Sequence, residues 1–109
     1  MVVIQSLYPV ISEKKEDALE IMAHMTNAAL RSEECISFEF FNSLDQPEKI
    51  LLVQEWTSSD ALKKHNTSSQ LMNLLAELPY LLSNDIKTTI FTVEPAETKF
   101  RETKIQVLH

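Results

Sequence analysis

The sequence predicts one α+β domain of the ferredoxin-like type, whose split β-α-β-β-α-β order gives a four-stranded antiparallel sheet with its helices on one face. Three observations indicate this fold. The 109 residues suit a single hydrophobic core. Four short apolar segments have the composition and alternation of strands. Two amphipathic helical segments fall between the first and second strands and between the third and fourth. Because crossover connections are right-handed, both helical segments should lie on the same face of the sheet.

The first strand and the first helix occupy the opening third of the chain. Residues 2–9 are apolar and β-branched up to Pro9, which favours a strand. Ser12 is a candidate helix cap, because its hydroxyl oxygen can accept a bond from a free N–H of the first turn. The helix that follows has an apolar stripe at helical spacing, formed by Ala18, Ile21, Met22, Met25, Ala28 and Ala29. Met22 and Met25 are accordingly predicted to be core residues.

A hairpin is predicted in the middle of the chain. Residues 35–43 alternate as a strand, which places Ile36, Phe38 and Phe40 together on one face. A turn with Asp and Pro follows, since these residues favour turn dihedrals. Residues 49–57 form the returning strand.

The second helical layer is predicted in two pieces, residues 60–64 and residues 69–78, separated by a polar break. Ser58 and Ser59 can cap the first piece. The second piece has a leucine stripe and stops at Pro79, which cannot continue a helix. Residues 86–93 form the fourth strand. The domain therefore spans residues 1–95, and residues 96–109 form a tail that is either disordered or an additional edge strand.

Composition excludes several classes of function. The chain contains no glycine, so the phosphate-binding P-loop, the dinucleotide-binding turn and the nucleophile elbow are all absent. The net charge of −6 disfavours nucleic acid and anionic membrane surfaces as partners. A single cysteine, Cys35, fits a reducing compartment. No apolar run is long enough to span a membrane. We therefore expect a cytoplasmic protein with neither nucleic acid nor membrane as a partner.

The predicted sheet has apolar residues on both faces, although the helices cover only one. The strand 49–57 has apolar side chains on each side, and the strand 86–93 adds Phe91 and Val93 opposite Ile86 and Ile90. A bare apolar sheet face is unusual in a monomer. Two copies packed face to face would bury the same patch twice, so we predict a homodimer through the sheet face.

The candidate site residues are polar or aromatic side chains near the junction of the third strand and the second helical layer. His65 is a candidate general base, or a helix-end histidine bonded to backbone. Trp56 is either a core ring or a wall for an aromatic ligand. Gln54 and Gln70 either bond each other and His65 or face a ligand. Tyr8 offers a hydroxyl at the pocket or its rim. Three scattered histidines and one cysteine give no metal constellation.

The pattern Gln54-x-Trp56 with His65 nine places on, and the aromatic strand after Cys35, resemble the antibiotic biosynthesis monooxygenase family of the dimeric α+β barrel superfamily. The resemblance covers about residues 2–94. It implies a dimer of ferredoxin-like protomers, each with a pocket between its helices and its sheet. Members include cofactor-free oxygenases of aromatic substrates, isomerases of small phosphorylated ketones, and haem-degrading enzymes. Gln54 stands where the family usually has glutamate, and Gln70 where it often has a second histidine.

The resemblance suggests a monooxygenase of a small phenolic, quinol or related aromatic substrate that uses no cofactor. In this interpretation His65 is the catalytic base and Trp56 the stacking wall, while Gln54 and Gln70 donate hydrogen bonds to the substrate anion and Tyr8 adds a hydroxyl. The alternatives are a non-catalytic dimer that binds a small ligand and an isomerase of a small carbonyl compound that also uses His65.

Overall fold

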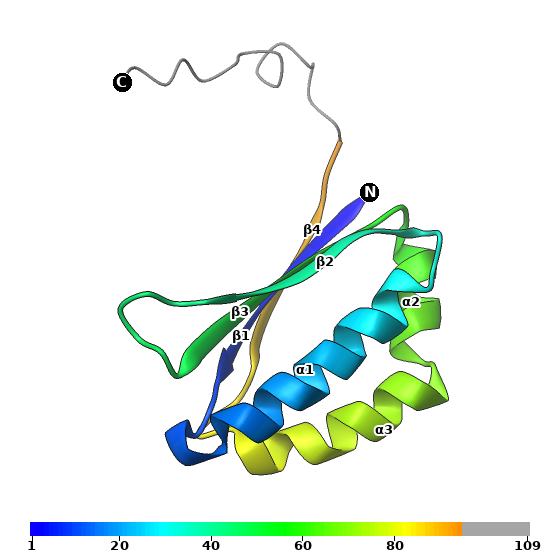
Figure 1. The fold of residues 1–109 in the computed structure, drawn as a ribbon. Coiled ribbons are helices and arrows are strands. Elements are labelled where there is room, and N and C mark those ends of the chain that lie inside the picture. Colours follow the sequence, from blue (N-terminus) through cyan, green and yellow to red (C-terminus); the bar gives the residue numbers. More distant parts are fainter. Residues whose placement is uncertain (95–109) are drawn as a thin grey trace, which may run out of the picture.

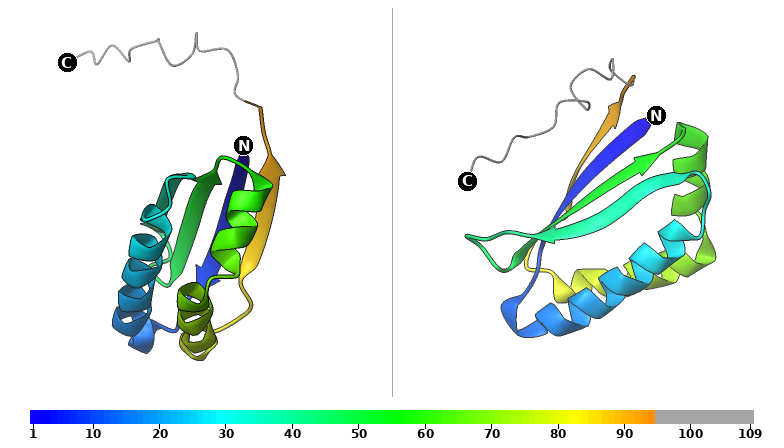
Figure 2. Two further views of the ribbon diagram at one scale, coloured as in Figure 1. Left: turned by 90° about the vertical axis from the view of Figure 1, so that its right-hand side faces the viewer. Right: turned by 45° about the horizontal axis from the view of Figure 1, so that its top comes forward.

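The computed structural model describes residues 1–94 and has two layers, a sheet and a layer of helices on one of its faces (Figures 1 and 2). The strands are β1 (Val2–Pro9), β2 (Cys35–Asn42), β3 (Lys49–Trp56) and β4 (Lys87–Thr92). The α-helices are α1 (Lys15–Leu30), α2 (Ser59–Asn66) and α3 (Ser69–Glu77), and the short 3-10 turns are η1 (Ser12–Lys14) and η2 (Leu78–Leu81). The predicted ferredoxin-like α+β fold is confirmed.

The strands lie in the order β2-β3-β1-β4, and every neighbouring pair is antiparallel. The two central strands, β1 and β3, pair along their full lengths, from Val2 opposite Trp56 to Pro9 opposite Lys49. In β3 the residues alternate between buried and half-buried positions from Lys49 to Trp56. This alternation places Ile50, Leu52, Gln54 and Trp56 on the face that the helices cover.

The two pieces of the second helical layer begin at serine caps. The Ser58 hydroxyl oxygen accepts a hydrogen bond from the Ala61 N–H at 3.1 Å, which starts α2. The Ser68 hydroxyl oxygen accepts one from the Leu71 N–H at 3.3 Å, which starts α3. Each cap satisfies a backbone N–H that has no partner inside the helix. The predicted break between the pieces is therefore confirmed, and it ends α2 directly after His65 and Asn66.

Two local predictions are wrong. Ser12 does not cap a helix: it lies inside η1, which follows Ile11 and has no side-chain cap, and α1 begins only at Lys15. Ile36 does not share the inner face with Phe38. The pairing of β2 with β3 shifts between Cys35 and Ser37, and this irregularity leaves Ile36 unpaired and 51% exposed. An extra residue in one strand reverses the alternation on one side of it.

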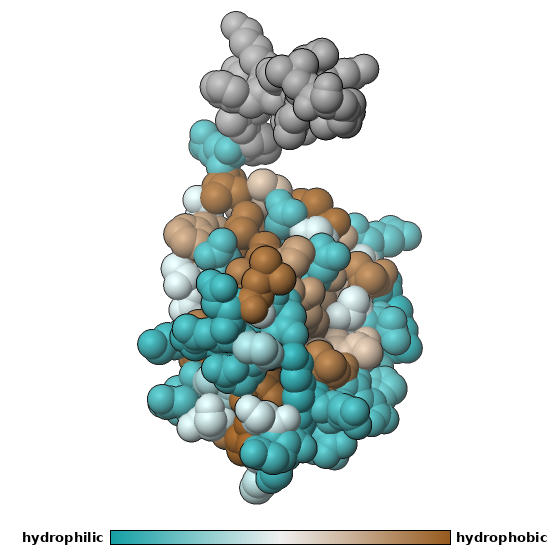
Figure 3. Space-filling model, turned by 60° about the vertical axis from the view of Figure 1, so that its left-hand side comes forward, coloured by the Kyte–Doolittle hydropathy of each residue, from teal (hydrophilic) through white to brown (hydrophobic). Residues whose placement is uncertain are grey.

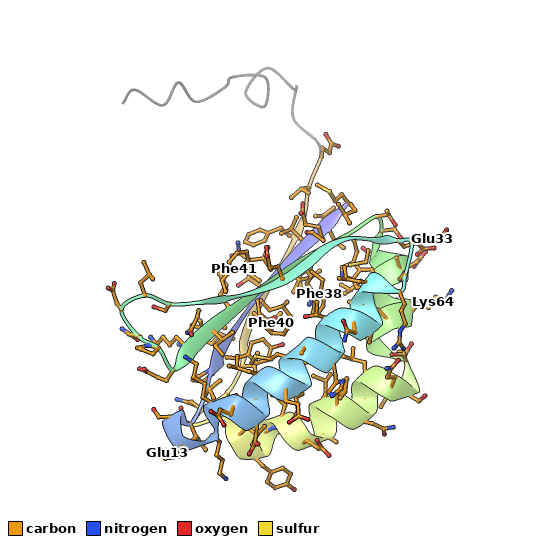
Figure 4. The ribbon with its side chains drawn as sticks, in the orientation of Figure 1. Glu13, Glu33, Phe38, Phe40, Phe41 and Lys64 are labelled. Atoms are coloured by element: carbon orange, nitrogen blue, oxygen red, sulfur yellow. The ribbon has the colours of Figure 1, made fainter. Side chains whose placement is uncertain are left out.

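The core lies between the sheet and the helices. Its buried members come from every strand except β4, together with the apolar stripe of α1 and the first leucines of the second helical layer. Met22 and Met25 are both buried there, as predicted. Phe38 and Phe40 point from β2 toward α1, whereas Phe41 points to the opposite face of the sheet (Figure 4).

The outer face of the sheet has no covering element within residues 1–94 (Figure 1). Phe41 and Phe91 on this face are 46% and 44% exposed, and the side chains of Leu51 and Val53 are half-buried beside them. Figure 3, which views the molecule from the side of the β2–β3 hairpin, shows apolar side chains gathered in patches among polar ones. Among the described helices, none is long and apolar enough to cross a membrane.

The predicted domain boundary at residue 95 and the predicted tail, residues 96–109, lie at or beyond the limit of the described residues.

Candidate functional site

A cavity of about 300 Å³ lies between the sheet and the helical layer. Its floor is the inner face of β1, β3 and β4 together with Phe38 of β2, and its roof comes from α1, α2 and α3. The apolar part of its lining consists of Ile4, Met25, Phe38, Leu52, Leu62, Leu71, Leu75, Ile86 and Ile90. The polar part consists of Ser6, Tyr8, Gln54, His65, Asn66 and Thr88. A mostly apolar cavity with a few polar groups is typical of a small-molecule site, and this one is at the lower end of the usual size range.

The cavity opens toward the edge strand β4. The residues that β1 and β3 contribute to the lining are buried, but Thr88 is exposed and Ile90 is 59% exposed. A ligand can therefore enter at the β4 edge and reach inward to β3, where Gln54 and His65 lie.

His65 lies in the last turn of α2, and its imidazole is packed among aromatic rings. Its ring centroid is 4.6 Å from that of Trp56, with the planes inclined by 33°, and 6.0 Å from that of Phe38. Burial lowers the pKa of His65 from its ordinary value of 6.5, because an apolar environment disfavours the charged imidazolium. The ring is therefore neutral at pH 7 and available as a proton acceptor.

Gln54 and Trp56 form a buried pair on the same strand. The indole Nε1–H donates a hydrogen bond to the Gln54 side-chain oxygen Oε1 at 2.8 Å. An indole nitrogen can only donate, so the amide atom it meets must be the oxygen. Trp56 is 0% exposed and does not line the cavity, whereas Gln54 is 8% exposed and does. The prediction that Trp56 is a stacking wall for a ligand therefore does not fit this geometry: its ring lies against His65 and is covered.

Tyr8 lines the cavity from β1 and is buried rather than at the rim. Burial raises the pKa of Tyr8 to about 12, and the nearby Ser6 hydroxyl opposes only part of this rise. The phenol is therefore protonated at neutral pH and can donate. Beside it, the hydroxyls of Ser6 and Thr88 are hydrogen-bonded across the β1–β4 pair at 3.0 Å.

Gln54 and Tyr8, two of the polar residues that line the cavity, are separated along the strands. Gln54 pairs with Ile4, and Tyr8 lies four residues farther along β1. At about 3.3 Å per residue this corresponds to roughly 13 Å between backbone positions. Leu52, Ser6 and Thr88 lie between them on the three neighbouring strands.

Gln70 is placed outside the cavity. Its side chain is exposed near the start of α3, where its oxygen Oε1 accepts a hydrogen bond from the Arg31 guanidinium at 3.1 Å. Its hydrogen bond is with Arg31 and not with Gln54, and it does not line the cavity, so we do not include it in the site. Sequence reasoning did not select Ser6, Asn66 and Thr88 as site residues, although all three line the cavity. Ser6 is spaced by two residues from Ile4 and Tyr8, so it shares their face of the strand. Thr88 shares the face of Ile86 and Ile90 in the same way. This spacing is the signal in the sequence that identifies Ser6 and Thr88.

Metal ligation has no support in the described part of the chain. Within residues 1–94, no group of three or more His, Cys, Asp or Glu side chains could hold a metal ion. The other histidine of this range, His24, is exposed on α1, away from the cavity.

Comparisons with known proteins identify the fold family. The sequence profile named antibiotic biosynthesis monooxygenase matches residues 1–74. A protein of Deinococcus radiodurans that carries the same family name superposes with a TM-score of 0.83 at 20% identity, covering 89% of this chain and 96% of that one. A conserved protein of Methanosarcina mazei superposes with a TM-score of 0.82 at 19% identity, covering 85% and 92%.

A third solved structure has a described activity. SnoaB, a cofactor-independent oxygenase from Streptomyces nogalater, superposes with a TM-score of 0.76 at 15% identity, covering 87% of this chain and 94% of that one. At these identities the superpositions establish a shared fold. None of the curated proteins matches the chain.

Proposed function

Because the chain belongs to the antibiotic biosynthesis monooxygenase family, we propose that it is a cofactor-independent monooxygenase of a small phenolic, quinol or related aromatic substrate. The observation that carries this proposal is a neutral imidazole, His65, at the inner end of an apolar cavity. The likeness to a cofactor-independent oxygenase of the same fold supports it further.

In the proposed reaction the substrate itself reduces oxygen. His65 accepts the proton of a phenolic hydroxyl, and the anion that results transfers an electron to O₂. The two radicals combine to form a peroxide at a ring carbon that carries hydrogen. The imidazolium of His65 returns its proton to the peroxide, and loss of water from the resulting hydroperoxide leaves a quinone. One atom of O₂ enters the product and the other leaves in water, so a phenol plus O₂ gives a quinone plus water without any other reductant.

The cavity provides what this chemistry needs from the protein. Its apolar lining residues reduce the amount of water around the anion and the radical pair at the inner end. Gln54 supplies a hydrogen-bond donor for a substrate oxygen near His65, and Tyr8 supplies another at the far end of the cavity.

The proposed assembly is a homodimer through the outer face of the sheet. Leu51, Val53, Phe41 and Phe91 lie on that face, which no element of residues 1–94 covers. A two-fold contact would bury this patch on both copies. Sedimentation of the purified protein tests this directly, and a monomer at micromolar concentration would contradict it.

Oxygen uptake with reduced naphthoquinones and anthrone tests the proposed activity. We expect uptake well above the rate of autoxidation without protein, and a fall of about 100-fold or more in the His65→Asn variant. His24→Asn is the matched control, because it removes an exposed histidine that does not line the cavity. Binding of these compounds without any oxygen uptake would contradict the monooxygenase and favour a ligand-binding dimer.

A further inference from the structure

The carboxamide of Gln54 has only one orientation that fits its surroundings. Its oxygen is occupied by the indole N–H of Trp56. Rotating the amide by half a turn would place two donors against each other, because Trp56 cannot accept. The amide nitrogen Nε2 must therefore point away from Trp56.

The Nε2 group is accessible from the cavity. Within residues 1–94, every buried side-chain nitrogen or oxygen has a hydrogen-bond partner. The only side-chain hydrogen bond of Gln54 in this range is the one that its oxygen accepts from Trp56. Since Gln54 is 8% exposed and lines the cavity, its N–H groups open into the cavity and not into bulk solvent.

From this geometry we infer that Trp56 is a positioning residue that fixes Gln54 as a hydrogen-bond donor, and that the site therefore selects ligands presenting a carbonyl or phenolate oxygen beside His65. A donor in an apolar cavity loses its water partners when a ligand enters. A ligand without an acceptor at that point leaves the N–H groups unpaired, which is costly. The inference rests on the proposed function only in taking this cavity as the substrate site.

A pair of ligands that differ by one oxygen isolates this contact. The bicyclic ketone 1-tetralone carries a carbonyl oxygen, and tetralin has the same ring system without it. Neither compound is turned over in the proposed reaction, so binding is measured separately from activity. The quantity of interest is the ratio of the dissociation constant of tetralin to that of 1-tetralone, determined by calorimetry or ligand-detected NMR.

Gln54→Met removes the donor and keeps the length of the side chain. We expect the ratio to fall by about 10-fold or more relative to the wild type, because a single hydrogen bond to a buried donor has about this effect. Trp56→Phe keeps an aromatic ring against His65 and removes the N–H, so the freed amide can turn either end to the cavity. The ratio should fall in this variant also, although Gln54 itself is unchanged.

Leu75→Met is the matched control, since it changes an apolar lining residue at similar volume and should affect both ligands alike. In the wild type the side-chain NH₂ resonances of Gln54 should shift with 1-tetralone and not with tetralin. That measurement needs no variant and holds even if Trp56→Phe does not fold.

Two outcomes would overturn the inference. One is an unchanged ratio in Gln54→Met. The other is a loss of the ratio in Tyr8→Phe instead, which would place the ketone at the opposite end of the cavity. A protein that shows the expected ratios but takes up no oxygen would retain this inference and lose the proposed oxygenase activity.

Discussion

The buried contact between Trp56 and Gln54 should be measurable as a coupling free energy of unfolding. Trp56→Phe leaves the Gln54 oxygen without its donor, which costs about 1–3 kcal/mol, and removes apolar surface worth about 1 kcal/mol. Gln54→Met leaves the indole N–H without its acceptor, again at about 1–3 kcal/mol. The double variant has neither the unpaired Gln54 oxygen nor the unpaired indole N–H, because both partners are replaced by apolar side chains. Its loss of stability should be smaller than the sum of the single losses by about 1–2 kcal/mol.

Urea unfolding of the four proteins measures this coupling. With a slope of about 1–3 kcal/mol per molar urea, a coupling of this size is well resolved in the midpoints. The concentration of protomer must be the same throughout, since the stability of a dimer depends on it. Leu81→Met combined with Trp56→Phe is the control pair. Leu81 packs near the far end of β1, so the stability losses of these two substitutions should add. If the Trp56 and Gln54 variants are additive within about 0.5 kcal/mol, the hydrogen bond contributes nothing and our account of the site is wrong.

The remaining predictions concern His65, the outer face of the sheet and the cap of α2. Because burial lowers the pKa of His65 below 6.5, oxygen uptake should rise with pH through this lowered pKa and be complete above it. Measuring the rate of oxygen uptake from about pH 5 to pH 8 tests this rise. The same shift should reduce stability as the pH falls below 6.5, since the unfolded chain then binds the proton more readily, and His65→Asn should lose this dependence in acid titrations. Val53→Lys should give monomers in sedimentation, whereas Leu44→Lys, which is 99% exposed in the turn after β2, should not. Ser58→Ala should cost about 1 kcal/mol in unfolding, because it removes the cap bond from Ala61.

The fold could be predicted because its signals are local and periodic. The alternation of β3 continues without interruption from Lys49 to Trp56, so its inner and outer residues are assigned correctly from the sequence. The stripe of α1 is equally regular. The irregularity at Ile36 was missed because the residue suits a strand in either orientation, and only its pairing with β3 shows that one residue is extra.

The placement of Gln70 was within reach of sequence reasoning. The buried stripe of α3 includes Leu71 and, at half-buried positions, Leu74 and Leu75. One residue on a helix corresponds to a rotation of about 100°, so Gln70 lies at the edge of this stripe rather than within it. Its contact with Arg31 at the end of α1 is tertiary and has no counterpart in the local pattern.

The role of Trp56 depends on contacts that no pattern contains. Alternation places it on the inner face, where a core ring and a cavity wall are equally compatible. The deciding fact is that α2 ends with His65 directly over the indole, so the imidazole faces the cavity and the indole is covered. This depends on the angle at which α2 leaves the sheet after the Ser58 cap, which is a property of the packed structure.

Polar residues at the inward-facing positions of a strand nevertheless indicate where the site lies. Ser6 in β1, Gln54 in β3 and Thr88 in β4 each take an inner position among apolar neighbours. Ser6 and Gln54 are buried, which is unfavourable unless such groups are paired, whereas Thr88 lies at the exposed edge of the cavity. Each of them has a partner from a strand: Ser6 and Thr88 bond each other, and Gln54 bonds Trp56. A protein that needed only a stable core would place aliphatic side chains there, as it does at Ile50 and Ile4. The polar exceptions to the alternating pattern therefore indicate the cavity from the amino-acid sequence, whereas the choice of donor or acceptor at each one depends on its hydrogen-bond partner in the folded chain.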